Sequence, residues 1–374
     1  MAVTLLAGVE DSTLNTSNNP RDMAANVFEL EPNVAPLLAI TSRTNSAPAI
    51  NPKIEWNEDE SMPRVTTLSA SAASNATVFG VTNDIFRVGD VVRDTTGGFG
   101  ILVTATAAGA ISGTFVGGTA QVSAASTDEL YIVANASQEG ASLREIKFPQ
   151  LVNASNYCEI VRTPFGLTRT EQKTQHYGGD EENRLKNKFG REHARALEQI
   201  GFYGVRDLKN TNQRMAGGLL EFISTNSTGA GGTLSEATFQ TFLTTGFRFG
   251  SERKILFCSP IAIKAIEGFA RSNIKTEGSS DHANEYGIVM KTYYSGQGIV
   301  DLVLHRDWND SATYKGYAFL VDMDAFKYRP LDDTRLKQNV QAPDYDGVKH
   351  EYLTEASFQI IHERRHAKIT GITG

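Results

Sequence analysis

Residues 179–203 read GDEENRLKNKFGREHARALEQIGFY, and this stretch decides the fold. Acidic residues stand in its first turn and basic residues in the following turns, the order that the helix dipole favours. Glu182 and Lys186 have the spacing of an i,i+4 ion pair. We therefore predict one long amphipathic helix packed against a sheet. The apolar residues that fall close to one helical face are Leu185, Phe189, Ala196 and Ile200.

The chain beyond this helix mixes further helices and strands. Glycine-rich breaks at 217–218 and 229–232 come first. Ser235 is placed to cap one helix, and Pro260 stands in the first turn of another. The predicted elements are a helix at 234–247, a strand at 254–258, a helix at 259–271, strands at 300–305 and 317–321, and a long alternating strand at 350–362.

The first 47 residues are predicted to form an extended arm. Asn, Ser, Thr and Pro dominate 11–20, and only short apolar patches follow, neither of which can form a core alone. An arm with such sparse anchors usually lies across another surface, so we expect it to contact a neighbouring subunit. The anchors are Val27, Phe28, Leu37 and Leu38.

Residues 67–143 have a different composition from the rest of the chain. They contain only eight charged residues and no lysine. Glycine pairs separate short β-rich runs, which is the turn chemistry of antiparallel strands. We predict a small β-barrel or sandwich inserted into the chain. Its strand-like runs lie at 85–93, 100–107, 110–116 and 129–134.

Two segments that mix β-formers with charges flank this module, at 53–66 and 145–169. If they pair, they make a long hairpin arm, which we assign to 48–66 and 144–170. An isolated two-stranded ribbon is only marginally stable in water. Its apolar side chains are therefore predicted to lie against a partner surface. They are Ile54, Trp56, Phe148 and Leu151.

Length and composition bound the class of protein. The 374 residues suffice for two or three domains, and a formal net charge of −7 argues against a protein whose main affinity is for nucleic-acid phosphates. Cys158 and Cys258 are most simply buried thiols in a reducing compartment. No stretch approaches the ~20 apolar residues of a membrane span, and the first residues lack a secretory signal. We expect synthesis in the cytoplasm.

The most specific motif in the chain is an H-E-x-x-H match at His362, Glu363 and His366. In zinc proteases this spacing works because a helix places both His on one face. Here the preceding residues read as a strand, in which positions four apart lie ~13 Å from each other, too far to share one zinc. We interpret the motif as a strand end with exposed charges. A zinc-dependent hydrolase built on it remains an alternative.

No other motif predicts catalysis. The glycines at 229–232 lack the Lys-Ser/Thr of a phosphate loop and the frame of a dinucleotide fingerprint. The aspartates between 322 and 333 lack the spacing of a calcium loop, and no G-x-S-x-G elbow occurs. We expect no enzyme activity, no cofactor and no catalytic or metal site.

Several short stretches, taken in order, carry a family resemblance. They are PNVAPLL at 32–38, IEW at 54–56, FRVGDVV at 86–92, EG at 139–140, VLHR at 303–306, FLVD at 319–322, HEYLT at 350–354 and HAKI at 366–369. Their order and spacing resemble the major head proteins of tailed bacteriophages, which have the Hong Kong 97-type capsid fold. The chain most resembles the subgroup with an extra β-module in its extended loop.

The resemblance implies an α+β capsid fold with five parts. These are an N-terminal arm (1–47), an extended-loop hairpin (48–66 and 144–170), an inserted all-β barrel or sandwich (67–143), a peripheral domain with a spine helix (171–209 and 346–374) and an axial α/β domain (210–345).

By the same resemblance, the protein would assemble with itself, through hexamers and pentamers, into the icosahedral shell of a virion. Many modest contacts between hairpin arms and neighbouring subunits would hold the shell together. The enclosed double-stranded DNA would be confined and its sequence not read. No long charged helical segment precedes the arm, which implies a separate scaffolding protein. A portal and a decoration protein are further expected partners, and no membrane partner is expected.

Three alternatives stay open. An encapsulin-like compartment shell shares the fold but encloses cargo enzymes. The zinc hydrolase belongs to another class, and metal analysis would distinguish it. A tail or decoration protein fits the β-rich composition but not the long helix.

Overall fold

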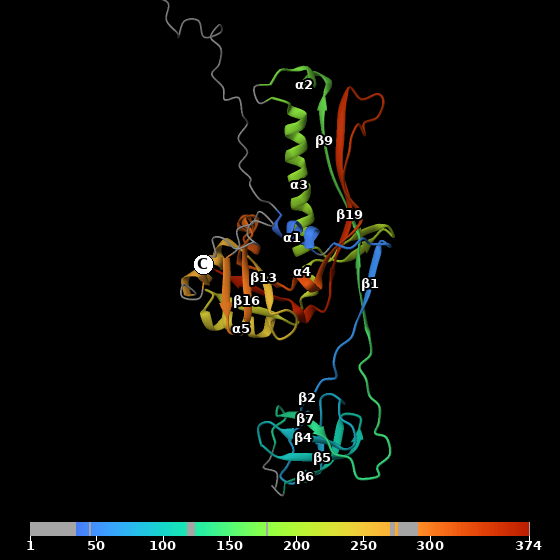
Figure 1. Cartoon of the computed structure of the whole chain (residues 1–374), viewed down its shortest axis with the longest axis vertical. Helices are drawn as coiled ribbons and strands as arrows, with labels where there is room; N and C mark the ends of the chain where they lie inside the picture. Colours follow the sequence, from blue (N-terminus) through green and yellow to red (C-terminus); the bar gives the residue numbers. More distant parts are fainter. Residues whose placement is uncertain are drawn as a thin grey trace, which may run out of the picture. The chain divides into compact units, whose positions relative to one another are not determined.

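A computed structural model describes residues 35–44, 46–117, 124–176, 179–269, 274–275 and 291–373. The chain divides into two compact units, one made of Met1–Glu55 with Ser155–Gly374 and the other of Trp56–Ala154. The division falls within a two-stranded ribbon formed by β1 (Lys53–Glu58) and β8 (Val152–Tyr157) (Figure 1). The predicted anchors Val27 and Phe28 lie outside the described residues.

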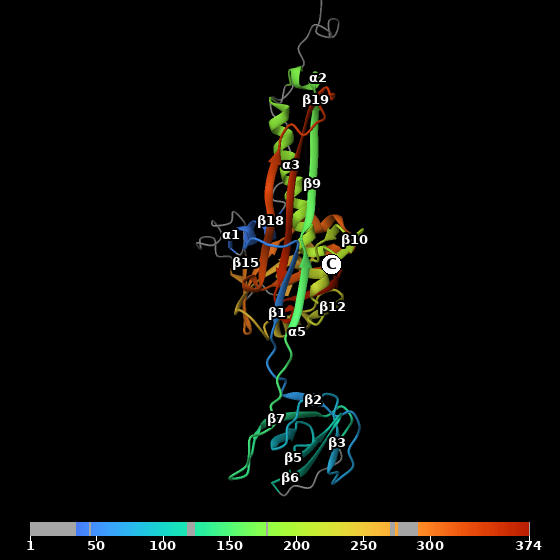
Figure 2. The ribbon, with the colours of Figure 1, turned by 90° about the vertical axis from the view of Figure 1, so that its right-hand side faces the viewer.

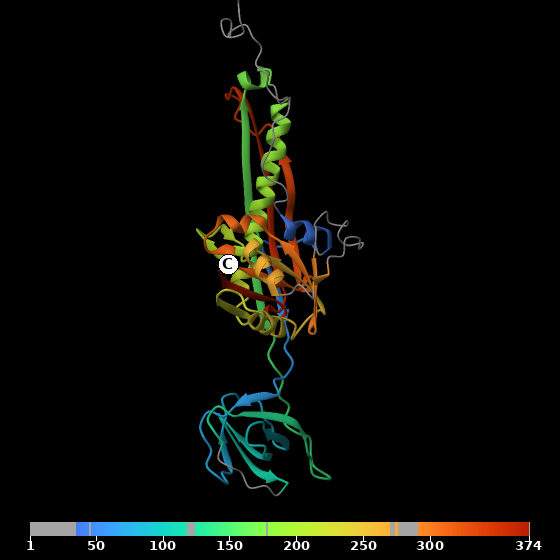
Figure 3. The same ribbon diagram turned by 90° about the vertical axis from the view of Figure 1, so that its left-hand side faces the viewer.

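The predicted long helix is confirmed as α3 (Glu181–Tyr203). The side chain of Asp180 accepts a hydrogen bond from the N–H of Glu182 and so caps the helix. Figures 1, 2 and 3 show α3 lying along a three-stranded antiparallel sheet in the order β18, β19, β9. These strands are β18 (Phe326–Lys337), β19 (Gly347–Ile360), which confirms the predicted long terminal strand, and β9 (Glu159–Thr168).

Aromatic and polar contacts fix α3 on this sheet. Phe189 stacks on Phe165 of β9 with ring centroids 5.3 Å apart. The buried ring of His193 lies 2.9 Å through Nδ1 from Oγ1 of Thr163 and 2.7 Å through Nε2 from Oγ1 of Thr354. Burial lowers the pKa of His193, so the ring is neutral at neutral pH. Helix and strands are therefore joined by directional contacts that set their register.

A mixed seven-stranded sheet forms the rest of this unit. Its strand order is β12, β20, β17, β13, β16, β15, β14, with β13 parallel to β16 and antiparallel to β17. The strands are β12 (Ser227–Gly232), β20 (Ala367–Ile372), β17 (Ala318–Val321), β13 (Arg253–Cys258), β16 (Gly298–Leu304), β15 (Lys291–Ser295) and β14 (Ile274–Lys275). The predicted strands at 254–258, 300–305 and 317–321 are confirmed.

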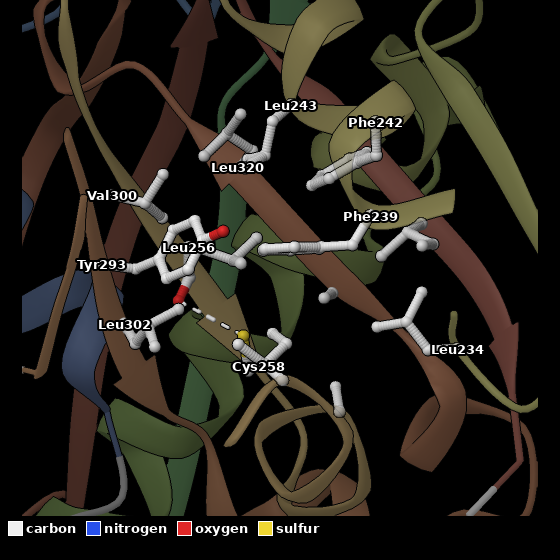
Figure 4. Packing of buried hydrophobic residues seen from close by; sticks show 14 of the residues in the cluster. Leu234, Phe239, Phe242, Leu243, Leu256, Cys258, Tyr293, Val300, Leu302 and Leu320 are labelled. Atoms are coloured by element: carbon white, nitrogen blue, oxygen red, sulfur yellow. Dashed lines mark hydrogen bonds between the residues drawn. The ribbon is translucent and has the colours of Figure 1, made fainter. Parts of the chain in front are cut away.

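Two predicted helices pack on this sheet. They are α5 (Glu236–Gly246), capped by Ser235 as predicted, and α6 (Pro260–Phe269). Figure 4 shows Phe239 of α5 pointing toward Leu256 of β13 and Tyr293 of β15, whose ring centroid lies 5.6 Å from that of Phe239. The core between helices and sheet is thus filled by side chains from several separate segments.

Residues 36–44 are helical, which corrects the prediction of an arm extended to residue 47. Leu37 and Ile40 of α1 (Pro36–Thr44) are 0% and 2% exposed and pack in one core with residues of α3 and β19. The buried carboxylate of Glu198 on α3 accepts hydrogen bonds from the N–H groups of Leu37 and Leu38 at 2.8 and 2.7 Å. These orphan donors of a helix N-terminus are thereby satisfied inside the subunit.

The unit Trp56–Ala154 is a closed barrel, one of the two predicted forms. Its six strands follow the order β2, β7, β4, β5, β6, β3, and an antiparallel bridge between Leu68 and Val81 joins the two ends. Phe79, Phe99 and Phe115 meet inside it, with ring centroids 5.9–6.3 Å apart. The strands are β2 (Val65–Thr67), β3 (Val78–Gly80), β4 (Asp90–Asp94), β5 (Gly100–Ala107), β6 (Ala110–Val116) and β7 (Glu129–Asn135).

The hairpin arm is shorter than predicted. Only β1 and β8 pair as a ribbon, whereas β9 pairs with β19 along its whole length. The mix of β-formers and charges at 145–169 indicated an extended segment but could not show its partner, which lies almost 200 positions away. The remaining elements are α2 (Arg169–Lys173), α4 (Leu219–Phe222), β10 (Asp207–Lys209), β11 (Gln213–Met215) and 3-10 helices at Arg306–Asp310, Tyr314–Gly316, Met323–Ala325 and Glu363–Arg365.

Replacing residues 67–143 by a short Gly/Ser linker should leave the other unit folded. The barrel has its own core, so its loss removes no packing from the core around α5 and β13. We expect a cooperative thermal transition by circular dichroism, with helical signal retained. Global unfolding of the deletion variant would show that the barrel is not a separate module.

Candidate functional site

The H-E-x-x-H motif forms a turn between β19 and β20. His362 has a positive φ of 51°, and Glu363–Arg365 form a 3-10 helix. The carboxylate of Glu363 accepts hydrogen bonds from the N–H and Oγ of Ser224, both at 2.7 Å, and from the N–H of Thr225 at 3.3 Å. Although burial opposes it, hydrogen bonding from Thr225 and Ser224 holds the pKa of Glu363 below its ordinary value.

The interpretation of this motif as a strand end with exposed charges is wrong. His366 is fully buried, and its Nδ1 accepts a hydrogen bond from the N–H of Asp322 at 3.2 Å. Glu363 holds the 224–225 turn rather than a water molecule. Across the described ranges, no group of three or more His, Cys, Asp or Glu is placed to hold a metal ion. The motif therefore acts in this fold as a polar link between β20 and the chain before β12.

Asp322 and Lys254 form a buried charged centre beside this turn. Lys254 is 1% exposed, and its Nζ donates to the carbonyl oxygens of Gly246, Phe249 and Arg365 at 2.7, 2.7 and 2.6 Å. Burial lowers the pKa of Lys254 to about 8. Two of the carbonyls follow one another at the end of α5 and the third belongs to the turn before β20, so one ammonium group joins these two segments.

The carboxylate of Asp322 balances the positive charges of Lys254 and Arg365. It accepts hydrogen bonds from the N–H and Oγ of Ser251, both at 3.0 Å, and from Nε of Arg365 at 2.9 Å. Burial alone would raise the pKa of Asp322, but the bonds from Ser251 and the charges of Arg365 and Lys254 hold it below the ordinary value. The charged groups of this centre thus have hydrogen-bond partners within the subunit.

Acid should destabilise the subunit through His366. Burial lowers its pKa to about 3, and the neighbouring charges are Asp322, Lys254 and Arg365. Between pH 6.5 and 3 the unfolded chain therefore binds a proton that the folded chain does not. The stabilisation is complete above about pH 6.5 and falls with pH, by on the order of 2 kcal/mol at pH 5.

Urea unfolding at pH 7 and pH 5 measures this effect. His366→Gln, which cannot titrate, should lose less stability between the two pH values than the wild type. His362→Ala serves as the control, because His362 is partly exposed, and should keep the wild-type difference. An equal pH dependence in wild type and His366→Gln would contradict the assignment.

Both cysteines are buried, as predicted, and both are free thiols. Burial raises the pKa of Cys158 to about 11, and burial also raises the pKa of Cys258. Since the thiolate is the reactive form, neither side chain is suited to nucleophilic catalysis at neutral pH.

Three of the predicted contact residues are buried within their own chain. Leu37, Ile54 and Trp56 are 0%, 6% and 8% exposed. Ile54 packs with Cys158, and the indole N–H of Trp56 donates to Oε1 of Glu58 at 2.7 Å. Their burial does not favour an inter-subunit contact at these side chains, and that assignment stays a prediction. Trp56 is ordinary core of the subunit.

Phe148 and Leu151 are the opposite case. They are 79% and 58% exposed and lie in a segment, residues 141–151, that has no helix or strand. Leu143 and Ile146 in the same segment are 88% and 73% exposed. The sequence interpretation missed these two, although apolar residues are interspersed with charged ones across 143–148. We call residues 143–152 the exit segment, because the chain leaves the barrel here.

Polar contacts hold the backbone of the exit segment to the barrel. Arg144 pairs with Asp90, and Nζ of Lys147 donates to the carbonyl oxygen of Phe86 at 2.8 Å. Arg87 donates in turn to the carbonyl oxygen of Lys147. The charged side chains are therefore used inside this unit while the apolar ones remain in solvent. Exposed apolar patches of this kind mark protein contact sites.

A model of the SU10 major capsid protein family matches residues 8–373. A search of curated proteins finds no match. No helix among the described residues is long and apolar enough to span a membrane.

Solved structures share the fold at low sequence identity. The chain is similar to the capsid of a native GTA particle, at 9% identity and a TM-score of 0.54 over 98% of this chain and 100% of that one. It is also similar to a chain from Mycobacterium phage Bobi, at 8% identity and a TM-score of 0.51 over 97% and 99%. The predicted Hong Kong 97-type capsid fold is thus confirmed. Because the family match covers nearly the whole chain, the protein belongs to the SU10 major capsid protein family.

Proposed function

We propose that this major capsid protein closes into an icosahedral phage head shell in which the exit segment of each subunit docks on a neighbour. The observation that carries the proposal is the exposure of Leu143, Ile146, Phe148 and Leu151 in a protein of a capsid family. Burying such a side chain contributes about 1.5–3 kcal/mol. A shell repeats the contact in every subunit, so the modest contacts add up to a stable particle.

The parts of the subunit are proposed to keep the roles that the resemblance implied. Residues 171–209 and 346–374 would form the peripheral domain, and 210–345 the axial domain around the capsomer centre. The packing of α3 on β19 supports the first, and the sheet centred on β13 supports the second. Two strands run against these bounds, because β18 pairs with β19 and β20 lies in the sheet of β13. The pairing of β9 with β19 favours extending the peripheral domain to include residues 159–168.

The proposed partners are those of a shell that first assembles and then receives packaged DNA. They are a separate scaffolding protein, a portal and a decoration protein, with assembly in the host cytoplasm. Packaged double-stranded DNA would be confined without sequence recognition, which suits a chain with a net charge of −7. The family match does not favour an encapsulin-like compartment.

We also propose that the chain has no enzyme activity. The support is the use of Glu363 as a structural acceptor and the burial of His366, which leave no zinc site at the H-E-x-x-H motif. Stoichiometric zinc in purified protein, lost in His362→Ala, would overturn this.

Sedimentation of the purified protein tests the proposed function. We expect shell-sized particles, formed by the protein alone or with its scaffolding protein, in equilibrium with slowly sedimenting subunits. A chain that sediments only as subunits in both cases would contradict the proposal.

A further inference from the structure

The barrel has an open pocket that gathers most of its positive charge. The pocket has a volume of about 410 Å³, and its lining includes Arg64, Arg87 and Arg144. These are three of the five Lys and Arg residues between 56 and 154, a segment that contains ten Asp and Glu residues. Asp90 is the one acidic residue in the pocket lining. A local positive site on an acidic unit attracts carboxylates.

Two of the three arginines, Arg144 and Arg87, make polar contacts within the barrel, and the third is Arg64. Arg144 pairs with Asp90 and donates through Nε to the carbonyl oxygen of Val88 at 3.3 Å, while Arg87 donates to the carbonyl oxygen of Lys147. Arg64 is exposed. Over the part of the chain that the structure describes, its guanidinium group has no hydrogen-bond or ion-pair partner. Arg64 is therefore the cation that an incoming carboxylate can bind.

Exposed apolar side chains adjoin Arg64. Val65 and Tyr131 are directly opposite each other across β2 and β7 and are 41% and 39% exposed. Val133, which also lines the pocket, is 49% exposed. An arginine beside aromatic and aliphatic surface is typical of a protein interface rather than of a site for a small free anion.

The same chain carries a carboxylate suited to this pocket. Residues 58–60 read EDE and lead into the connector before β2, which has no helix or strand at 59–64. Asp59 is exposed, and within the described ranges its carboxylate has no hydrogen-bond or ion-pair partner. Asp59 and Arg64 lie five positions apart in the same copy, so each copy carries both the carboxylate and the pocket. When two copies meet about a two-fold axis, Asp59 of each copy can face the pocket of the other, and the contact forms twice.

We propose that this pocket is an assembly contact between two copies of the chain, in which Asp59 of one copy binds Arg64 of the other. The inference rests on the proposed function, because it needs copies brought together in a shell. It adds a polar contact with defined orientation to the apolar contact made by the exit segment. Opposite charges also set the register of a contact, since a shifted pairing would place like charges together.

Charge reversal in two separate chains tests this contact. Arg64→Glu alone places two acidic groups together, and Asp59→Arg alone places two basic groups together. Each should raise the protein concentration needed for assembly about fivefold or more. An equal mixture of the two variants restores opposite charges across the contact, and its assembly concentration should return toward the wild-type value. Arg93→Glu is the matched control, because Arg93 is an exposed arginine of the same barrel outside the pocket.

Recovery in the mixture, with normal assembly of Arg93→Glu, supports the contact. Unimpaired assembly of the two single variants overturns it, as does impairment that mixing does not relieve. An Arg93→Glu variant as impaired as Arg64→Glu would show a general charge effect and likewise overturn it. If the wild-type chain itself forms no shells, both the proposed function and this inference are overturned. If the wild-type chain forms normal shells and one of the contrary results above is found, only this inference is overturned.

Discussion

A subunit in which Phe148 and Leu151 are both replaced by serine should fold normally and fail to assemble where the wild type forms shells. Both side chains are largely exposed in the subunit, so their loss removes no packing from it. If each is buried against a neighbour, the two together contribute about 2–4 kcal/mol per contact. The protein concentration needed for assembly should then rise at least about thirtyfold.

Light scattering over a concentration series measures this shift, and thermal melts of the dilute subunit check folding. Val205→Ser with Val340→Ser is the matched control, because these side chains are also exposed, at 65% and 46%, but belong to the other unit. A double variant at 148 and 151 that assembles like the wild type would remove the exit segment from the interface. A large fall in subunit melting temperature would mean that these residues are packed within the subunit.

Asp322→Ala should destabilise the isolated subunit by about 3–5 kcal/mol, the cost of removing one partner from a buried ion pair. The change leaves Lys254, which is 1% exposed, without a balancing carboxylate, and Arg365 without its partner. The N–H of Ser251 loses its acceptor as well. We expect a clear fall in the urea midpoint at pH 7.

Asp324→Ala is the control for this measurement. Asp324 is exposed and accepts a hydrogen bond from the same Ser251 hydroxyl at 2.7 Å, so its loss should cost below about 1 kcal/mol. Equal effects of the two substitutions would show that the charge of Asp322 is not needed to hold Lys254 in the core.

Local patterns predicted the elements of this fold well. The acidic-to-basic order of 179–203 and its apolar face indicated α3, and strict alternation over 350–362 indicated β19. Glycine-separated β-runs marked a self-contained module before its closure into a barrel could be known. These signals act over a few residues, so the sequence displays them directly.

Contacts between distant segments were not predictable in the same way. Glu198 accepts from the amides of α1, 160 or more positions away, and nothing local to Leu37 marks it as core. Trp56 and Ile54 stand in an extended, charged context, yet both are buried. The buried pair Lys254 and Asp322 was missed because charged residues in a sequence look exposed until the partner segment is known. Leu143 and Ile146, by contrast, stand among charged residues in the local sequence, and this signal was overlooked.

Negative-stain electron microscopy of the purified protein, alone and with its scaffolding protein, tests the central claim most directly when wild type and the Phe148→Ser, Leu151→Ser variant are imaged side by side. We expect closed shells of uniform size for the wild type and only dispersed subunits for the variant at the same concentration. Closed shells from both proteins, or from neither, would contradict that claim.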